Sequence, residues 1–149
     1  MANFLQLAEK AKKLTKSRLE KDLFDYIRRL EHYILDFNKY QIQDESEDIY
    51  GNALGFYSEA TQDFNPEKVA GSPFTGYDSG KWLNSFALKV TNNSIKFYSK
   101  DIEKSKLIAN SESWLSDELY GLTDENLQEV ISEKLLPFFI QNFRNILDL

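Results

Sequence analysis

The sequence predicts an α+β protein in which helices at both ends of the chain pack on a small antiparallel sheet. Three observations support this prediction. Apolar residues recur at helical spacing from Phe4 to Phe37, an alternating pattern runs from Trp82 to Val90 and returns from Ile95 to Ser99, and a capped amphipathic segment follows Thr123. A chain of 149 residues is long enough for one hydrophobic core and short for two, so we expect a single domain over residues 1–149.

The first region, residues 1–40, is expected to be helical. Its apolar residues lie three or four positions apart and form one stripe, with Lys, Arg and Glu opposite. One helix of ~35 residues would be ~50 Å long, which is more than a compact domain of this size covers. Ser17 followed by Glu20 is typical of a capping box. We therefore expect two helices that meet near Thr15, or an N-terminal turn that projects and makes contacts.

Residues 41–80 form a glycine-punctuated loop region without a regular period. A stretch of about 40 such residues inside a small domain is either functional or ordered only by a partner. It contains more aromatic side chains than disordered linkers do. We predict that these aromatics form an assembly interface, with ordinary core packing as the alternative. The predicted interface residues are Tyr50, Phe56, Tyr57, Phe64, Phe74 and Tyr77.

Residues 81–99 are predicted to form a β-hairpin. Because side chains alternate across a strand, Trp82, Phe86 and Val90 share one face, which we expect to be the core side. Asn92 and Asn93 suit the turn because asparagine tolerates positive φ.

The C-terminal helix is expected over residues 123–149. Thr123 is its N-cap candidate, and Asp124 and Glu125 fall in the first turn, where the helix dipole favours negative charge. Pro137 lies in the middle of the apolar pattern, where it removes a backbone donor and is expected to kink or divide the helix.

Composition excludes several classes of protein. Hydrophobic residues make up 42% of the chain and aromatics 14%, which excludes global disorder. There is no apolar run near 18 residues and no signal-peptide core, so we expect no membrane span and no secretory signal. A net charge of −6 argues against broad phosphate-backbone binding, and we expect no sequence-specific nucleic-acid contact. Zero cysteines exclude disulfides, thiol catalysis and thiolate metal sites.

The chemistry-bearing residues form no catalytic motif, so we expect no enzyme activity, no cofactor and no metal. His32 lies on a predicted helix without a Ser or Cys motif, as surface histidines do. The acidic run 44–48 lacks the glycine and spacing of a calcium loop and is interpreted as solvated, with a divalent cation as the alternative. The stretch 76–81 misses the P-loop pattern and precedes a predicted strand. Trp82 and Trp114 are expected in the core.

Three segments, in this order and spacing, resemble the small tail-completion and neck proteins of tailed bacteriophages. Ser79–Phe86 corresponds to a "TGxLxxSI" strand, Ile95–Ser99 to an "I-x-[FI]-x-S" return strand, and Gly121–Asn126 to a "GLs/t-D/E-E-x" helix start. Upstream, the stretch from Ile49 to Thr61 resembles the version found in phages of Bacteroidetes hosts, crAss-like phages among them. The chain departs from the pattern in Ser79, where threonine is usual, and in lacking the "YA-x-x-x-E-x-G" segment, which is replaced by residues 102–114.

This resemblance implies a structural virion protein made in the host cytoplasm and located at the head–tail junction. It implies a homo-oligomeric ring, sixfold or twelvefold, between a portal or connector protein and the tail-tube protein. A negatively charged subunit also suits a conduit, because a like-charged wall lets DNA pass without sticking. Two hypotheses from other classes stay open: a host-side soluble module that binds a protein through residues 41–80, and a small hydrolase that uses paired carboxylates.

Overall fold

The computed structural model describes residues 3–91, 93–110 and 117–149 and confirms the α+β class. Helices dominate, and the sheet is a two-stranded antiparallel hairpin. The elements in chain order are α1 (Phe4–Ala11), α2 (Lys16–Arg29), α3 (Glu31–Gln43), α4 (Glu59–Phe64), α5 (Lys81–Asn84), β1 (Phe86–Val90), β2 (Ile95–Ser99), α6 (Ile102–Asn110), the 3₁₀ turn η1 (Asp117–Leu119), α7 (Asp124–Val130), the π-helical turn η2 (Ile131–Leu135) and α8 (Leu136–Leu147).

The N-terminal helical region is divided near Thr15, as predicted, but by a different cap. The Thr15 hydroxyl accepts a hydrogen bond from the Arg18 backbone at 3.1 Å and begins α2. The capping box predicted at Ser17 is instead formed at Asn3 and Gln6, at the start of α1. A second, unpredicted division falls at Leu30, between α2 and α3.

The C-terminal helix begins at the predicted cap and is divided before its proline. The Thr123 hydroxyl accepts from the Asn126 backbone at 3.3 Å. In η2 the Leu136 amide donates to the Ile131 carbonyl, five residues back. Pro137 follows in the first turn of α8 and has no backbone N–H to donate. The wider π turn thus lies directly before the proline, and the chain stays helical through both.

The predicted strand Trp82–Val90 is wrong in its first half. Gly80 adopts a left-handed conformation (φ 85°) and begins the short helix α5, so β1 starts only at Phe86. Trp82 and Leu83 are both buried within this helical turn. The return strand Ile95–Ser99 is confirmed, and Phe86 pairs with Ser99 and Val90 with Ile95. The predicted turn residue Asn92 lies outside the described residues.

The loop region 41–80 folds back on itself instead of forming a disordered stretch. It contains α4 and two isolated antiparallel bridges, Glu47 with Ala53 and Phe56 with Pro73. At Gly76 (φ 67°) a Cβ would lie 2.7 Å from the Trp82 ring, so a side chain there would displace a core tryptophan. The loop is thereby attached to the core at its C-terminal end.

The core consists of two hydrophobic clusters, and the hairpin residues Leu88 and Phe97 pack against both. One surrounds Trp82 with residues of α3, α5 and β1, and the other joins α2, α3 and α7. The first consists of Leu35, Ile42, Leu54, Trp82, Leu83, Phe86 and Leu119, and the second of Ile27, Ile34 and Val130. The prediction that Trp82 lies in the core is therefore confirmed. Trp114, for which the same was predicted, lies outside the described part of the chain.

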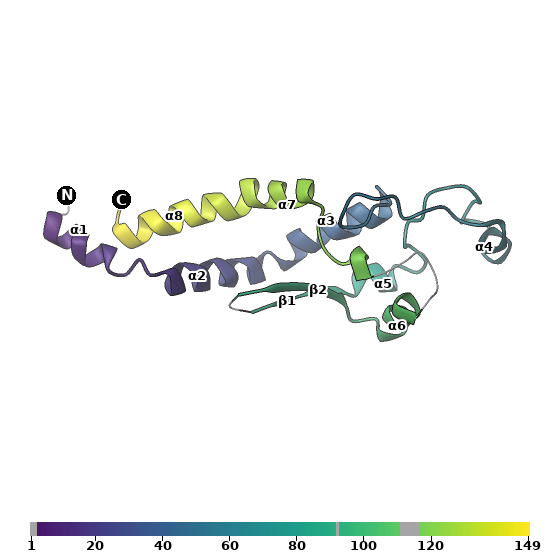
Figure 1. Ribbon diagram of the computed structural model, residues 1–149, viewed down its shortest axis with the longest axis horizontal. Helices are drawn as coiled ribbons and strands as arrows, with labels where there is room; N and C mark the ends of the chain where they lie inside the picture. The colour runs from purple at the N-terminus through teal and green to yellow at the C-terminus, as the bar shows by residue number, and fades with distance from the viewer. Residues whose placement is uncertain (1–2, 92, 111–116) are drawn as a thin grey trace.

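The molecule is elongated, with both termini at the same end (Figure 1). Helices α1 to α3 follow one another along the long axis, and α7 to α8 return beside them. The solvent-accessible surface is 10123 Å². A compact monomer of 17.4 kDa exposes about 7,900 Å², so this chain exposes roughly 2,200 Å² more.

Candidate functional site

The predicted interface aromatics occupy two different environments. Four of them are exposed: Tyr50 (68%), Phe56 (63%), Phe64 (94%) and Tyr77 (49%). Phe74 packs against the Trp82 cluster, as the alternative of core packing expected. These aromatic side chains therefore lie along one end of the molecule without forming a single cluster.

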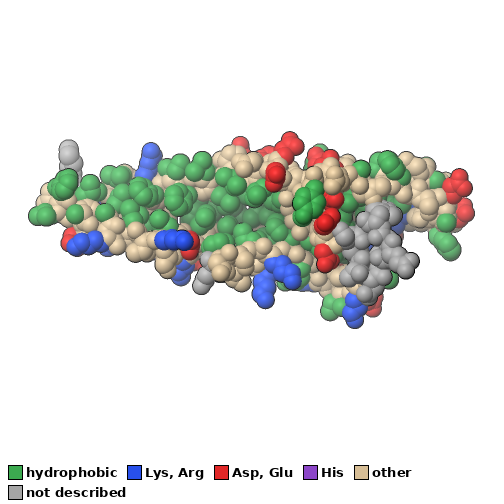
Figure 2. All heavy atoms as spheres, in the orientation of Figure 1, with side chains coloured by type: hydrophobic (Ala, Val, Ile, Leu, Met, Phe, Trp, Pro, Cys, Tyr) green, Lys and Arg blue, Asp and Glu red, His purple; other side chains and the backbone are tan. Residues whose placement is uncertain are grey.

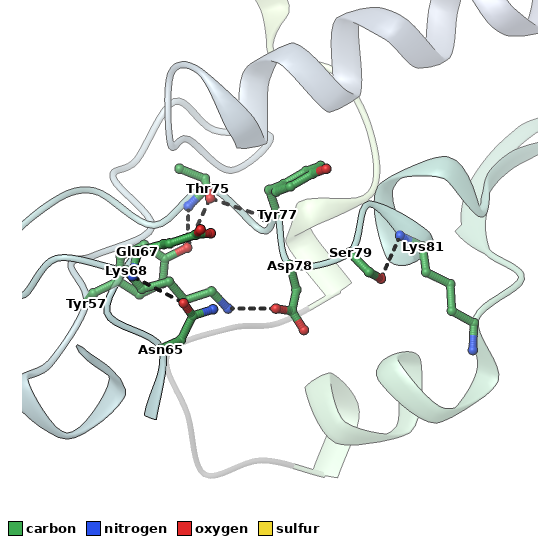
Figure 3. Close-up of polar contacts among 9 residues, drawn as sticks. All are labelled: Tyr57, Asn65, Glu67, Lys68, Thr75, Tyr77, Asp78, Ser79 and Lys81. Atoms are coloured by element: carbon green, nitrogen blue, oxygen red, sulfur yellow. Dashed lines mark hydrogen bonds and ion pairs between the residues drawn. The ribbon is translucent and has the colours of Figure 1, made fainter. Parts of the chain in front are cut away.

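Tyr57 has a structural role that the sequence did not suggest. Its hydroxyl accepts a hydrogen bond from the Thr75 backbone at 3.1 Å and lies 3.0 Å from the Thr75 hydroxyl, which also accepts from the Tyr77 backbone (Figure 3). Its ring packs at a tilt against Phe74, with centroids 5.8 Å apart. Tyr57 thus ties the two sides of the loop together across 18 residues.

A pocket of 380 Å³ opens beside this tyrosine. Lys68 lies at its edge, 3.8 Å from the Asp78 carboxylate and 5.7 Å from the centre of the Tyr57 ring (Figure 3). Lys68 and Asp78 are partners of each other within the loop. Two further carboxylates, Asp44 and Glu67, line the pocket, and neither has a cation within 4.0 Å among the described residues. We interpret its contacts as holding the loop in shape.

A buried polar cluster connects α3 to the segment that enters α7. Asn38 and Gln41 are fully buried. The Asn38 amide donates to the Leu119 carbonyl (2.8 Å) and accepts from the Gly121 backbone (3.3 Å). The Gln41 oxygen accepts from the Thr123 backbone (2.9 Å) and from the Asn126 side chain (3.1 Å). We call Asn38, Gln41 and Asn126 the polar clamp, because they hold the turn that places α7 against α3.

Helices α1 and α8, at the end of the molecule that holds both termini, expose an apolar face that the sequence analysis did not predict. The outward stripe of α8 consists of Leu136, Phe139, Ile140 and Phe143, each more than one third exposed. On α1, Phe4 (86%) and Leu5 are exposed, and no residue of this helix is buried. Figure 2 shows hydrophobic side chains gathered over α1, α2 and α8 on the face in view. The sequence signal was present, because residues 135–147 are apolar on more than one side of a helix.

Between α3 and α7 lies a groove of 480 Å³, here called the α3–α7 groove. Its lining is mostly aromatic and acidic, and we call its aromatic residues the floor and its carboxylates the rims. The lining residues are Tyr33, Phe37, Tyr40, Asp36, Glu45, Glu125, Asn126 and Glu129. Figure 2 shows acidic side chains over this part of the molecule. Among the described residues, none of these four carboxylates has a cation within 4.0 Å, although Lys134 lies 5.1 Å from the Tyr33 ring.

Two pKa values at the groove are raised, chiefly by burial. Burial raises the pKa of Glu45, and the negative charges of Glu47 and Glu125 raise it further. Burial also raises the pKa of Tyr33, with further contributions from Glu129 and Glu133. Burial alone gives both shifts this sign, and the neighbouring carboxylates add to it.

The histidine and the acidic run considered in the sequence analysis show no catalytic arrangement among the described residues. His32 is exposed. In the acidic run, the Asp48 carboxylate accepts from the Tyr50 and Asn52 backbones at 2.9 Å each and so forms a turn. Over residues 3–91, 93–110 and 117–149, no group of three or more His, Asp or Glu side chains is placed to hold a metal ion. None of the helices in these ranges is long and apolar enough to cross a membrane.

No family model, curated protein or solved structure matches this chain. The functional argument therefore depends on the surfaces described above.

Proposed function

We propose that the protein is a structural subunit of a tailed-phage virion, an adaptor that forms a ring at the head–tail junction. The observation that carries this proposal is the excess surface: roughly 2,200 Å² beyond that of a compact monomer, with large apolar side chains exposed at both ends. Obligate subunit interfaces bury 2,000 Å² or more summed over both partners, about 1,000 Å² from each, so the excess surface of this chain is large enough for such a contact.

An adaptor needs two kinds of contact, and the chain offers two separate surfaces for them. The apolar face of α1 and α8 suits contacts between copies of the chain. The loop aromatics Phe56 and Phe64, displayed at the other end, suit contacts with the portal or connector protein on one side and the tail tube on the other. The order of the "TGxLxxSI"-like and "GLs/t"-like segments supports the neck from the sequence. The first of these segments departs from the pattern in structure, because Lys81–Asn84 is helical and only Phe86 belongs to a strand.

The direct test is a map of the particle made from the genome that encodes this chain. We expect several symmetric copies at the portal vertex. A single copy, or a position away from that vertex, would contradict the proposal.

A variant test separates assembly from folding. Phe56→Ser with Phe64→Ser removes two exposed rings, and each lost interface anchor costs about 2 kcal/mol, repeated around a ring. We expect an unchanged melting temperature and particles in which heads and tails fail to join. The matched control is Val69→Ser, which is exposed in the same loop but is not aromatic. Normal virions from the double variant would exclude the loop from the junction.

The alternative, a host-side module that binds a protein through residues 41–80, uses the same loop. The exposed α8 stripe favours the adaptor, because a monomeric module has no use for a second apolar surface.

A further inference from the structure

Charge is distributed very unevenly along this chain. Residues 1–21 contain six basic and two acidic side chains, a net charge of +4, whereas residues 22–149 contain twelve and twenty-two, a net charge of −10. The chain therefore has a basic N-terminal segment and an acidic body. We call residues 3–13 of this segment the basic arm, because Lys10, Lys12 and Lys13 stand there against a single acidic residue, Glu9. The arm also carries the most exposed apolar side chains of the helical end, Phe4 and Leu5.

We propose that the basic arm, residues 3–13, docks into the α3–α7 groove of a second copy, so that subunits associate head to tail. The groove has an aromatic floor for Phe4 and Leu5 and acidic rims for Lys12 and Lys13. Both partners thus combine an apolar contact with opposite charge, which gives affinity from the first and orientation from the second.

The arm cannot reach the groove of its own chain. Helix α1 contacts α8, and Lys10 forms an ion pair with Asp148 at the C-terminal end of that helix. The groove lies at the opposite end of the helical segment 124–147, which is about 35 Å long. Figure 1 shows α1 and α7 separated along the long axis. The occupant is therefore the arm of another copy.

Helix α1 has groups available for contact with a second copy of the chain. Its capping box satisfies amides of its first turn within the helix itself, so these amides need no partner from the rest of the chain. Lys13 has no carboxylate within 4.0 Å in the described part of the chain, and Lys12 pairs only with the exposed Glu9. These cations are available to a neighbour at little cost.

Head-to-tail contacts generate closed rings or open filaments, because each copy uses two different surfaces. This inference rests on the proposed function for the ring, but the contact itself does not require a phage. It names the surfaces through which the copies of the proposed adaptor meet.

The first test reverses charge on each partner separately. The arm variant is Lys12→Glu with Lys13→Glu, and the groove variant is Asp36→Lys with Glu129→Lys. All four side chains are exposed, so folding should be unaffected. By sedimentation, each variant alone should dissociate, with an apparent dissociation constant about tenfold or more above that of the natural chain.

An equal mixture of the two variants gives the decisive result. The natural arm of the groove variant can meet the natural groove of the arm variant, and the reversed arm can meet the reversed groove. Each contact between unlike variants then joins opposite charges, so the mixture should associate although neither variant does alone. The matched controls are Lys89→Glu with Lys96→Glu, and Asp63→Lys with Glu67→Lys, which make the same charge changes on exposed residues elsewhere. We expect these controls to associate as the natural chain does. A mixture that stays monomeric would overturn the proposal.

Cross-linking gives a second readout that does not depend on charge. Because the chain has no cysteine, Leu5→Cys and Tyr40→Cys each introduce the only thiol. A mixture of these two variants should oxidise to a disulfide dimer. Leu5→Cys alone should not form one, and neither should a mixture of Leu5→Cys and Lys96→Cys. Dimers of Leu5→Cys alone would show arm-to-arm contact and contradict head-to-tail association. A natural chain that is monomeric at every concentration, with no mixed disulfide, would also overturn it.

The two proposals fail separately. If the chain lies in a ring at the portal vertex but the arm variant assembles normally, the arm contact is wrong and the adaptor stands. If the arm contact holds in solution but the particle lacks the chain at that vertex, the adaptor is wrong and the contact stands.

Discussion

The polar clamp and the basic arm are two regions of one chain whose polar groups have opposite surroundings, buried at the clamp and largely exposed at the arm. At the clamp, Asn38 and Gln41 are fully buried and each makes hydrogen bonds to backbone that lies about 80 residues away. At the arm, no residue of α1 is buried, and one ion pair, between Lys10 and Asp148, connects it to the body.

The difference teaches that stability and assembly are separated in this molecule. A buried, fully bonded amide is expensive to disturb, because removing it leaves backbone groups without partners. An exposed helix held by a surface ion pair contributes little to folding and stays available for other contacts. Changes at the clamp should therefore alter unfolding, and changes at the arm should alter association.

The largest effect is expected at Gln41. Gln41→Ala leaves the Thr123 amide and the Asn126 side chain without their acceptor in the protein interior. We expect a loss of about 3 kcal/mol in the free energy of unfolding, measured by urea denaturation. The control is Gln43→Ala, at the exposed end of the same helix, which should change stability by less than about 0.5 kcal/mol. Equal effects in the two variants would show that the clamp contributes no specific stability.

Gly121 is the next most sensitive position, because two separate constraints meet there. Its φ is +150°, and a Cβ would lie 2.9 Å from a side-chain carbon of Ile49. We expect Gly121→Ala to cost about 2 kcal/mol. Gly51 (φ +78°) has open space around it, so Gly51→Ala should cost about 1 kcal/mol from the backbone alone. Adding Ile49→Ala to Gly121→Ala should recover part of the loss if the close contact matters.

The sequence predicted those elements whose signals are local. The cap at Thr123, the return strand at Ile95 and the division near Thr15 each depend on a few adjacent residues, and all three are present. The start of β1 was misjudged because alternation was extended through Trp82 and Leu83. The positive φ of Gly80 turns the chain into a helix there.

The clamp and the α3–α7 groove could not be predicted, because they depend on contacts across the chain. Asn38 and Gln41 resemble the solvated side of a helix in the sequence, and their partners lie more than 80 positions later. The groove likewise joins Tyr33 to Glu129. The exposed aromatics were found from glycine punctuation alone, but the loop's internal ties through Tyr57 were not.

A smaller effect on the free energy of unfolding is expected within residues 41–80, where a hydrogen-bonded tyrosine can be compared with an exposed phenylalanine. Tyr57→Phe removes only the hydroxyl that bonds to Thr75, and we expect a loss of about 1 kcal/mol in the free energy of unfolding. Phe64→Ser removes a ring that is 94% exposed and should leave stability unchanged within about 0.5 kcal/mol. Thermal melts of the two variants, measured side by side, check the order. A larger loss from Phe64→Ser would place this ring in the core.

The smallest effect on folding is expected at the ion pair between Lys10 and Asp148, and it should depend on pH. The hydrogen bond and the charge of Lys10 lower the pKa of Asp148. A lowered pKa means that the carboxylate is stabilised in the folded state, so this contribution is present above the ordinary aspartate pKa of about 3.9 and is lost as the pH falls through the lowered value. Lys10→Met should raise the Asp148 pKa toward its ordinary range, with the charge of Lys13 still lowering it, as measured by NMR titration. It should also speed hydrogen exchange in α1 without moving the urea midpoint. Lys12→Met, whose partner Glu9 lies on the same exposed helix, should leave the Asp148 titration as it is. A shift of the global midpoint by Lys10→Met would mean that the arm unfolds together with the body, and the separation between a stabilising clamp and a detachable arm would then be wrong.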